Sequence, residues 1–221
     1  MRKTGKILLE LLYPTRCILC REELSPGIPR LCRRCQETLR PPANTRFPYV
    51  SLCVSALSFE NEAAEAIRRY KFRGCRAYAD AFGQLISERV FDELNGRYDL
   101  ITWVPVSGDR RRERGYDQSR LLAESAAKHL RQSAVSTLKK KRRVPRQSML
   151  DNPQARKANV LGVYTVPKPE TIEGKRILLV DDIVTSGATI SECAKTLMMA
   201  GAAEVLAAAL ANTPKGLAKN A

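Results

Sequence analysis

The stretch GKRILLVDDIVTSGATISECAKTLMMAG, from Gly174 to Gly201, decides the fold of this chain. It begins with an uninterrupted apolar run, Ile177 to Val180, which is typical of a parallel strand covered on both faces. The run ends in two adjacent acids, Asp181 and Asp182, and burying an unpaired carboxylate is costly. We therefore expect the acids at the carboxyl end of the strand, where open α/β sheets bind ligands. There they can meet solvent, cations or hydroxyl donors.

A hydroxyl-rich turn follows the acidic pair, and it combines three hydroxyls with a glycine that can adopt a positive φ. The turn consists of Thr185, Ser186, Gly187, Ala188 and Thr189. Apolar residues then recur at helical spacing up to Met198, and Gly201 stands where a helix commonly stops. The N-terminus of this helix directs a partial positive charge at the turn, which predicts a phosphate site beside a diol or metal site. An ordinary strand, turn and helix with a solvated acidic pair is the alternative.

The order of these features resembles the signature of phosphoribosyltransferases that use phosphoribosyl pyrophosphate (PRPP). That signature is four apolar residues, two aspartates, two apolar residues and Thr-Ser-Gly-Ala-Thr. The resemblance implies an α/β fold of the type I phosphoribosyltransferase kind, a parallel sheet flanked by helices. It also implies that Asp181 and Asp182 are the catalytic pair that holds the ribose 2′- and 3′-hydroxyls. The turn would wrap the 5′-phosphate, and Mg²⁺ would accompany PRPP.

The length of 221 residues suits one α/β domain with a small appendage. No segment has the roughly 18 consecutive apolar residues of a membrane span, and the short run Ile7 to Leu12 predicts an amphipathic helix without a signal-peptide cleavage site. We therefore expect a cytoplasmic protein without membrane insertion. In that reducing compartment the seven cysteines are expected to be metal ligands or core residues rather than disulfides.

Four of the cysteines form two Cys-x-x-Cys pairs, Cys17 with Cys20 and Cys32 with Cys35. This is the ligand set of a small structural zinc site, because each pair sits on a tight knuckle and four thiolates complete a tetrahedron. The segment between the pairs has almost no apolar residues, so metal would supply its stability. A redox pair or two disulfides are the alternatives, but neither a βαβ pattern nor an export signal accompanies the cysteines.

The segment from Pro41 to Pro48 is a stiff polar linker and marks a boundary. We expect an N-terminal helix and zinc-binding module over residues 1–45 and a phosphoribosyltransferase-like domain over residues 46–221. Within the domain, strands are expected at Val50–Phe59, Leu100–Val106 and Val205–Leu210, and helices at Asn61–Gly74 and Ala77–Leu94.

Further segments resemble the ComF family, phosphoribosyltransferase-like proteins of bacterial DNA uptake that carry an N-terminal four-cysteine module. They are YKFRG (residues 70–74), RERGYDQS (residues 112–119) and shorter elements in residues 147–150 and 156–164. The resemblance implies that Lys71 and three arginines contact the substrate, the arginines in a basic loop over pyrophosphate. Those arginines are Arg110, Arg112 and Arg114, and the planar fork of arginine suits phosphate oxygens.

Family members often carry a histidine early in this loop, and the chain has none there. Its one histidine, His129, lies late in the next helix and is expected to be a surface residue rather than a catalyst. Trp103 is expected to be a core anchor rather than a stacking platform. No residue is an obvious base for activating an acceptor.

The chain has a formal net charge of +15, and the excess is uneven. Between Val106 and Arg146 there are thirteen basic and four acidic residues, an excess of nine. A polyanionic partner is indicated, either a pyrophosphorylated sugar or a nucleic acid backbone. Solubility alone is the alternative, and the run Lys139 to Arg143 must face solvent or a polyanion.

Two functions are therefore open. The first is an enzyme of DNA uptake that binds PRPP with Mg²⁺ and transfers its phosphoribosyl group to an unidentified acceptor. The second is a non-catalytic adaptor that keeps the PRPP site and binds single-stranded DNA or competence proteins. The acidic pair and turn favour the first function, and the basic stretch favours the second.

Overall fold

The computed structural model describes residues 15–25, 30–140 and 162–213. The predicted helix from Ile7 to Leu12, most of the basic run Lys139 to Arg143 and the family-like elements in residues 147–150 and 156–161 lie outside these ranges. None of the helices in the described ranges is long and apolar enough to cross a bilayer.

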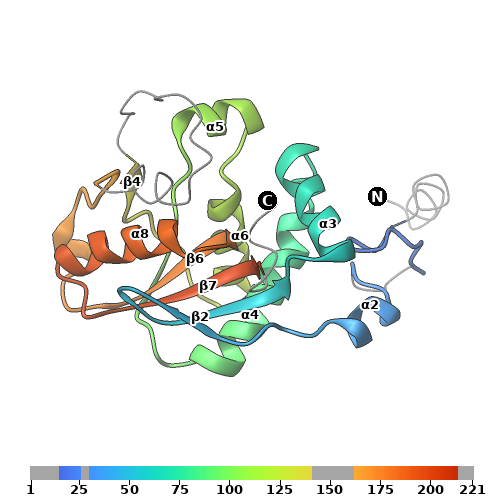
Figure 1. The fold of residues 1–221 in the computed structure, drawn as a ribbon, viewed down its shortest axis with the longest axis horizontal. Coiled ribbons are helices and arrows are strands. Elements are labelled where there is room, and N and C mark those ends of the chain that lie inside the picture. The colour runs from blue at the N-terminus through green and yellow to red at the C-terminus, as the bar shows by residue number, and fades with distance from the viewer. Residues whose placement is uncertain (1–14, 26–29, 141–161, 214–221) are drawn as a thin grey trace, which may run out of the picture.

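A five-stranded sheet forms the centre of the molecule, in the order β1-β2-β7-β6-β3 (Figure 1). Its strands are β1 (Thr45–Phe47), β2 (Val50–Ser58), β3 (Leu100–Trp103), β6 (Arg176–Val184) and β7 (Glu204–Asn212). The pairs β2–β7, β7–β6 and β6–β3 are parallel. The predicted parallel sheet is confirmed for these four strands, and the antiparallel pair β1–β2 makes the whole sheet mixed. A second sheet pairs β4 (Lys139–Lys140) with β5 (Tyr164–Thr165).

Helices cover both faces of the sheet (Figure 1). On one face lie α4 (Tyr78–Leu94) and α6 (Gln118–His129), with α3 (Asn61–Phe72) beside them, and on the other lies α8 (Ala188–Met199). Alternate residues of β6 serve the two sides: Leu178 packs with α4 and α6, whereas Leu179 packs with α8. The uninterrupted apolar run in β6 therefore reflects a strand buried on both faces.

The strand after α4 is shorter than predicted. It ends at Trp103 rather than Val106, because Pro105 has no N–H to donate to a neighbouring strand. The segment after it is also not a plain loop, since α5 occupies Gly108–Arg114. Trp103 is 8% exposed and belongs to the core, as expected.

The four-cysteine segment packs directly against the larger unit. Its apolar residues share a buried cluster with Ile67 of α3 and Phe82 of α4, and a short helix, α2 (Arg33–Thr38), closes the segment. The linker from Pro41 to Pro48 is not wholly without secondary structure, because Thr45–Phe47 pairs with β2 as an edge strand.

Candidate functional site

Asp181 and Asp182 lie inside β6 and are almost completely buried, with exposed fractions of 7% and 9%. The apolar run predicted only the part of the strand before the acids, and β6 includes both of them. The strand runs on to Val184, because residues 183 and 184 still pair with β7, whose Asn212 lies opposite Val184. The acids nevertheless lie near the carboxyl ends of the parallel strands, as predicted.

Each acid of the pair meets the kind of partner that the sequence predicts, a hydroxyl donor or a cation. The Ser119 hydroxyl donates a hydrogen bond to Asp181 Oδ1 at 3.0 Å. The Lys71 Nζ atom forms an ion pair with Asp182 Oδ2 at 2.7 Å. Asp181 also accepts the backbone N–H of Asp182 at 2.8 Å. The pair is therefore held by two helices and by its own backbone.

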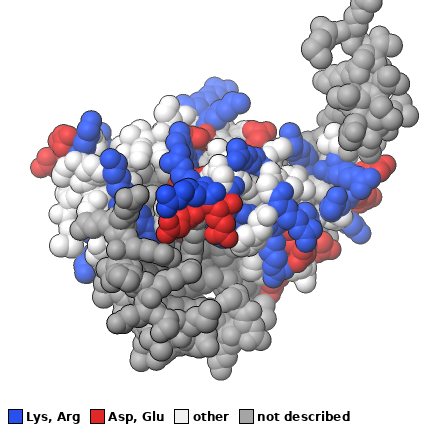
Figure 2. Space-filling view, turned by 90° about the horizontal axis from the view of Figure 1, so that it is seen from above, with Lys and Arg blue, Asp and Glu red and all other residues white. Residues whose placement is uncertain are grey.

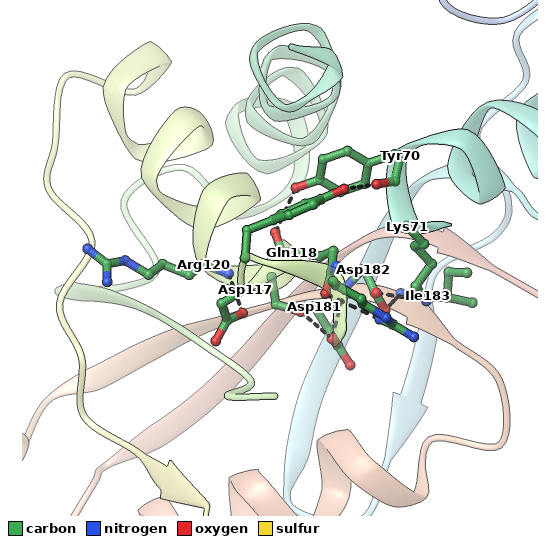
Figure 3. A network of polar contacts seen from close by, with 11 residues as sticks. Tyr70, Lys71, Asp117, Gln118, Arg120, Asp181, Asp182 and Ile183 are labelled. Carbon is green, nitrogen blue, oxygen red and sulfur yellow. Dashed lines mark hydrogen bonds and ion pairs between the residues drawn. The ribbon is translucent and has the colours of Figure 1, made fainter. Parts of the chain in front are cut away.

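A hydrogen-bond network ties those two helices together above β6 (Figure 3). The Tyr70 hydroxyl in α3 donates to the carbonyl of Gln118, the first residue of α6, at 2.9 Å. The Tyr116 hydroxyl donates in return to the Tyr70 carbonyl. At the start of α6, the Asp117 carboxylate accepts the N–H of Arg120 at 3.1 Å and caps the helix. The network fixes where Ser119 and Lys71 reach the acids.

Sequence reasoning found Lys71 but gave no role to Tyr70, Gln118 or Ser119. All three lie in the segments that carry the family resemblance. Membership of those segments was the only signal in the sequence, since their burial, with each no more than 1% exposed, is known from the structure alone. A buried hydroxyl or amide needs a partner, so such residues point to a network.

Burial, and then the charge of neighbouring Asp182, raise the pKa of Asp181 from 3.8 to about 7. Hydrogen bonds from the Asp182 N–H and from Ser119 act in the opposite direction but do not cancel the effect of burial. Burial also raises the pKa of Asp117. Near neutral pH Asp181 therefore stands between its neutral and ionised forms.

Asp181→Asn should remove a pH dependence of stability between about pH 4 and pH 7. An unfolded aspartate loses its proton near pH 3.9, whereas folded Asp181 keeps it until about pH 7. The folded state binds more protons in this window, so the free energy of unfolding falls as pH rises, by up to about 1.4 kcal/mol per pH unit. Urea unfolding at several pH values measures it. The cysteine cluster is the same in both proteins, so its own pH dependence cancels in the comparison. Parallel curves of unfolding free energy against pH would contradict the prediction.

The turn after β6 has the geometry predicted for it. Gly187 has a φ of 76° and forms the N-cap of α8 without a side-chain cap. The hydroxyls of Thr185, Ser186 and Thr189 have no hydrogen-bond partner among the described residues, and Thr185 and Ser186 are exposed. The free N–H groups of the first turn of α8 and these hydroxyls form a donor set suited to an anion.

Gly187→Ala should destabilise the protein by about 1–3 kcal/mol more than Gly74→Ala, because a new methyl group would overlap the Phe47 ring. A Cβ on Gly187 would lie 2.1 Å from Phe47 Cδ1. Gly74 is the matched control, since its φ of 67° gives a similar backbone strain with nothing within 4 Å. Urea unfolding measures both. The excess should vanish in a Phe47→Ala background, and an equal loss at both glycines would contradict the contact.

The structure separates the predicted arginines. Arg114 donates to Gln118 Oε1 at 3.2 Å, and its guanidinium lies 4.9 Å from the centre of the Phe72 ring. It is therefore part of the α3–α6 contact region. Arg112 is exposed and pairs with Asp109 at 2.6 Å. The side chain of Arg110 lies outside the part that the structure describes.

The four cysteines come together as the spacing predicts. Their Sγ atoms all lie within 4.8 Å of one another, and Cys20 Sγ is 3.6 Å from Cys32 Sγ. Four Zn–S bonds of about 2.3 Å in a tetrahedron would place sulfurs about 3.8 Å apart, so the cluster fits zinc. No disulfide joins them, and the N–H of Cys35 donates to Cys32 Sγ at 3.4 Å.

His129 is exposed at the end of α6, 3.5 Å from Asp80, and it lies apart from the contacts that hold the acidic pair. A hollow of about 420 Å³ also lies away from the acidic pair. It opens between the cysteine segment and α4, beside Gln36 and Arg89.

Several known proteins are similar to this chain in sequence. Residues 117–220 match the family model of the phosphoribosyl transferase domain. The chain is 30% identical over 185 residues to the DNA utilization protein YhgH of Salmonella typhi. The aligned region covers 81% of this chain and 76% of that protein. It is 27% identical over 156 residues to the competence protein ComFC of Bacillus subtilis. Here the aligned region covers 67% of this chain and 59% of that protein.

Among solved structures, the glutamine PRPP amidotransferase from B. subtilis, complexed with ADP and GMP, is similar over 65% of this chain and 30% of its own. The sequence identity is 21% and the TM-score is 0.46. The chain thus spans less than two thirds of the ComFC protein and less than one third of this amidotransferase.

Proposed function

Because the chain belongs to the ComF family, we propose that it binds PRPP together with Mg²⁺ and transfers the phosphoribosyl group to an acceptor during DNA uptake. The observation that supports this most is the buried acidic pair of β6 with the anion-suited turn directly after it. An ordinary strand would not need two carboxylates that two separate helices hold in place. A ligand with a diol next to a phosphate makes use of both features.

In the proposed site, Asp182 accepts hydrogen bonds from the ribose hydroxyls. Lys71 keeps its charge balanced, because a buried ionised carboxylate needs a cation and the two groups are 2.7 Å apart. Asp181 acts as a positioning residue, since it accepts the N–H of Asp182. Together they hold the sugar so that the bond to pyrophosphate is aligned for attack.

The 5′-phosphate binds at the turn in this proposal. The N–H groups at the start of α8 and the hydroxyls of Thr185, Ser186 and Thr189 donate to its oxygens, and Ala188 contributes backbone only. Gly187 allows the close approach of the backbone, because its φ is 76°.

The departing pyrophosphate is placed near α5, where we assign Arg110, Arg112 and Arg114 to its negative charge. Mg²⁺, when bound with PRPP, supplies further neutralisation of that charge. Arg114 already reaches the α3–α6 contact through Gln118. Arg112 would exchange Asp109 for a phosphate oxygen, which is feasible because both are exposed.

Calorimetric titration with PRPP tests the proposal. We expect binding that requires Mg²⁺ and weakens when ribose 5-phosphate, which lacks pyrophosphate, replaces PRPP. Turnover is then measured as pyrophosphate release with free nucleobases or oligonucleotides as acceptors. Absence of any PRPP binding in the presence of Mg²⁺ would exclude the proposed site.

We also propose that residues 1–45 form a zinc-stabilised module and residues 46–221 the phosphoribosyltransferase-like domain. The four-cysteine cluster supports the first unit, and the boundary falls at the start of β1, whose first residue is Thr45. Since the two units share a buried cluster, the module is proposed to be a fixed part of the protein rather than a tethered one.

A second candidate function is the binding of single-stranded DNA and competence proteins without turnover. In the view from above in Figure 2, Lys and Arg side chains are spread over the described part of this face, with Asp and Glu side chains beside several of them. Exposed members of α5 and the turn after α3 include Arg73, Arg76, Arg111 and Arg112. The adaptor would show oligonucleotide affinity that falls steeply with salt and persists in Asp181→Ala and Asp182→Ala. Loss of Mg²⁺-dependent PRPP binding in those two variants would favour the enzyme.

A further inference from the structure

One turn of α3 contacts three separate parts of the molecule. Arg69 donates to the carbonyls of Ile18 and Leu19 in the cysteine segment, at 2.8 Å each. Tyr70 donates to the start of α6, and Lys71 reaches Asp182 in β6. Successive helical residues point about 100° apart, so this turn reaches all three neighbours at once.

The Arg69 contact falls on the first cysteine knuckle. Ile18 and Leu19 are the two residues between Cys17 and Cys20, and all of Cys17, Ile18 and Leu19 are at most 4% exposed. Arg69 itself is 8% exposed. A buried guanidinium needs acceptors, so its position depends on those two carbonyls.

The position of those carbonyls depends in turn on the metal. The knuckle is held by hydrogen bonds such as Arg21 N–H to the Cys17 carbonyl at 2.9 Å, and no disulfide joins its cysteines. Such small segments fold when metal joins the thiolates. Loss of metal would therefore release the acceptors that hold Arg69.

We infer that Arg69 is a positioning residue that couples metal at the four cysteines to the phosphoribosyl site through Lys71. The inference rests on the function proposed above, because it takes PRPP as the ligand of this site. With metal bound, the knuckle fixes Arg69, the last turn of α3 is held, and Lys71 is held against Asp182. Without metal, this turn loosens and the site binds PRPP less tightly. Because coupling is reciprocal, PRPP must tighten metal binding by the same factor.

The test measures zinc affinity of the full chain by competition with a chromogenic chelator, with and without PRPP and Mg²⁺. We expect PRPP to tighten zinc binding about tenfold, within the usual range of coupling between sites. In Arg69→Met the zinc affinity should be the same with and without PRPP and Mg²⁺. Arg69→Lys should give a change of intermediate size. Arg68→Met is the matched control, because Arg68 is exposed and pairs with Glu65 instead. It should keep the full effect.

Three results would overturn the inference. If PRPP binds but leaves zinc affinity unchanged, or if the change persists in Arg69→Met, the coupling is wrong while the proposed function stands. If PRPP does not bind, the proposed function fails and hydrogen exchange decides the coupling. Zinc removal should then speed exchange of the amides of residues 69–73 in the natural protein and not in Arg69→Met. Equal exchange with and without zinc in the natural protein rejects the link.

Discussion

Asp182→Ala is expected to lower the affinity for PRPP with Mg²⁺ by at least about 100-fold. In the proposed site this carboxylate accepts two hydrogen bonds from the ribose, and each hydrogen bond to a charged group contributes about 1.5–3 kcal/mol. Losing both costs about 3 kcal/mol or more, and each 1.4 kcal/mol is about tenfold in affinity. The substitution also leaves the ammonium group of Lys71, which is 15% exposed, without its partner.

Two further variants separate ligand binding from structural damage. Asp92→Ala changes the net charge equally at an exposed position of α4, so it controls for long-range charge. Lys71→Met combined with Asp182→Asn removes the unpaired cation and should restore stability without restoring PRPP affinity. Calorimetry and urea unfolding measure the two properties. Affinity within about threefold of the natural protein in Asp182→Ala would show that the diol binds elsewhere.

The strand, acidic pair, turn and helix were predictable because their signals are local. A continuous apolar run, a glycine that must adopt a positive φ and a glycine after the helix each act on a few neighbouring residues. Gly187 and Gly201 have φ values of 76° and 99°, as that reading requires. The cysteine cluster was predictable for the same reason, since metal-ligand spacing is itself a local pattern.

The features that were missed depend on partners far along the chain. β6 continues past Asp182 because β7 offers residues up to Asn212 to pair with, and no local pattern shows that. The hydroxyl that meets Asp181 comes from Ser119, 62 residues earlier. Contacts of this kind follow from how α6 packs on the sheet, which the local pattern does not contain.

The helix α5 was not predicted, although the signal for it was local. Its arginines are good helix formers, and Asp109 lies in its first turn where an acid is favourable. The family resemblance to a basic loop outweighed that propensity. Similarly, the prolines around Thr45–Phe47 indicated a linker, but an edge strand tolerates proline at its flanks.

Removal of the metal is expected to have the largest effect on stability. The protein should carry about one zinc per chain, and Cys32→Ser should lose it together with the fold of the cysteine segment. Zinc binding contributes about 10–16 kcal/mol to the folding of isolated zinc-finger peptides, which is an upper limit here. The buried residues Ile18, Leu19 and Leu31 would leave the cluster that they share with α3 and α4.

The consequence of that loss reaches beyond the segment itself. Ile67 and Phe82 would be left facing solvent on one side, so the rest of the chain should also unfold at lower denaturant concentration. Elemental analysis measures the zinc content and urea unfolding measures the stability of the chain. Limited proteolysis of residues 15–45 measures whether the cysteine segment is folded. Cys75→Ser is the matched control, because Cys75 is partly exposed and lies outside the cluster. If Cys32→Ser were as stable and as resistant to protease as Cys75→Ser, the cysteines would not hold a structural metal, and the route through Arg69 would lose its first step.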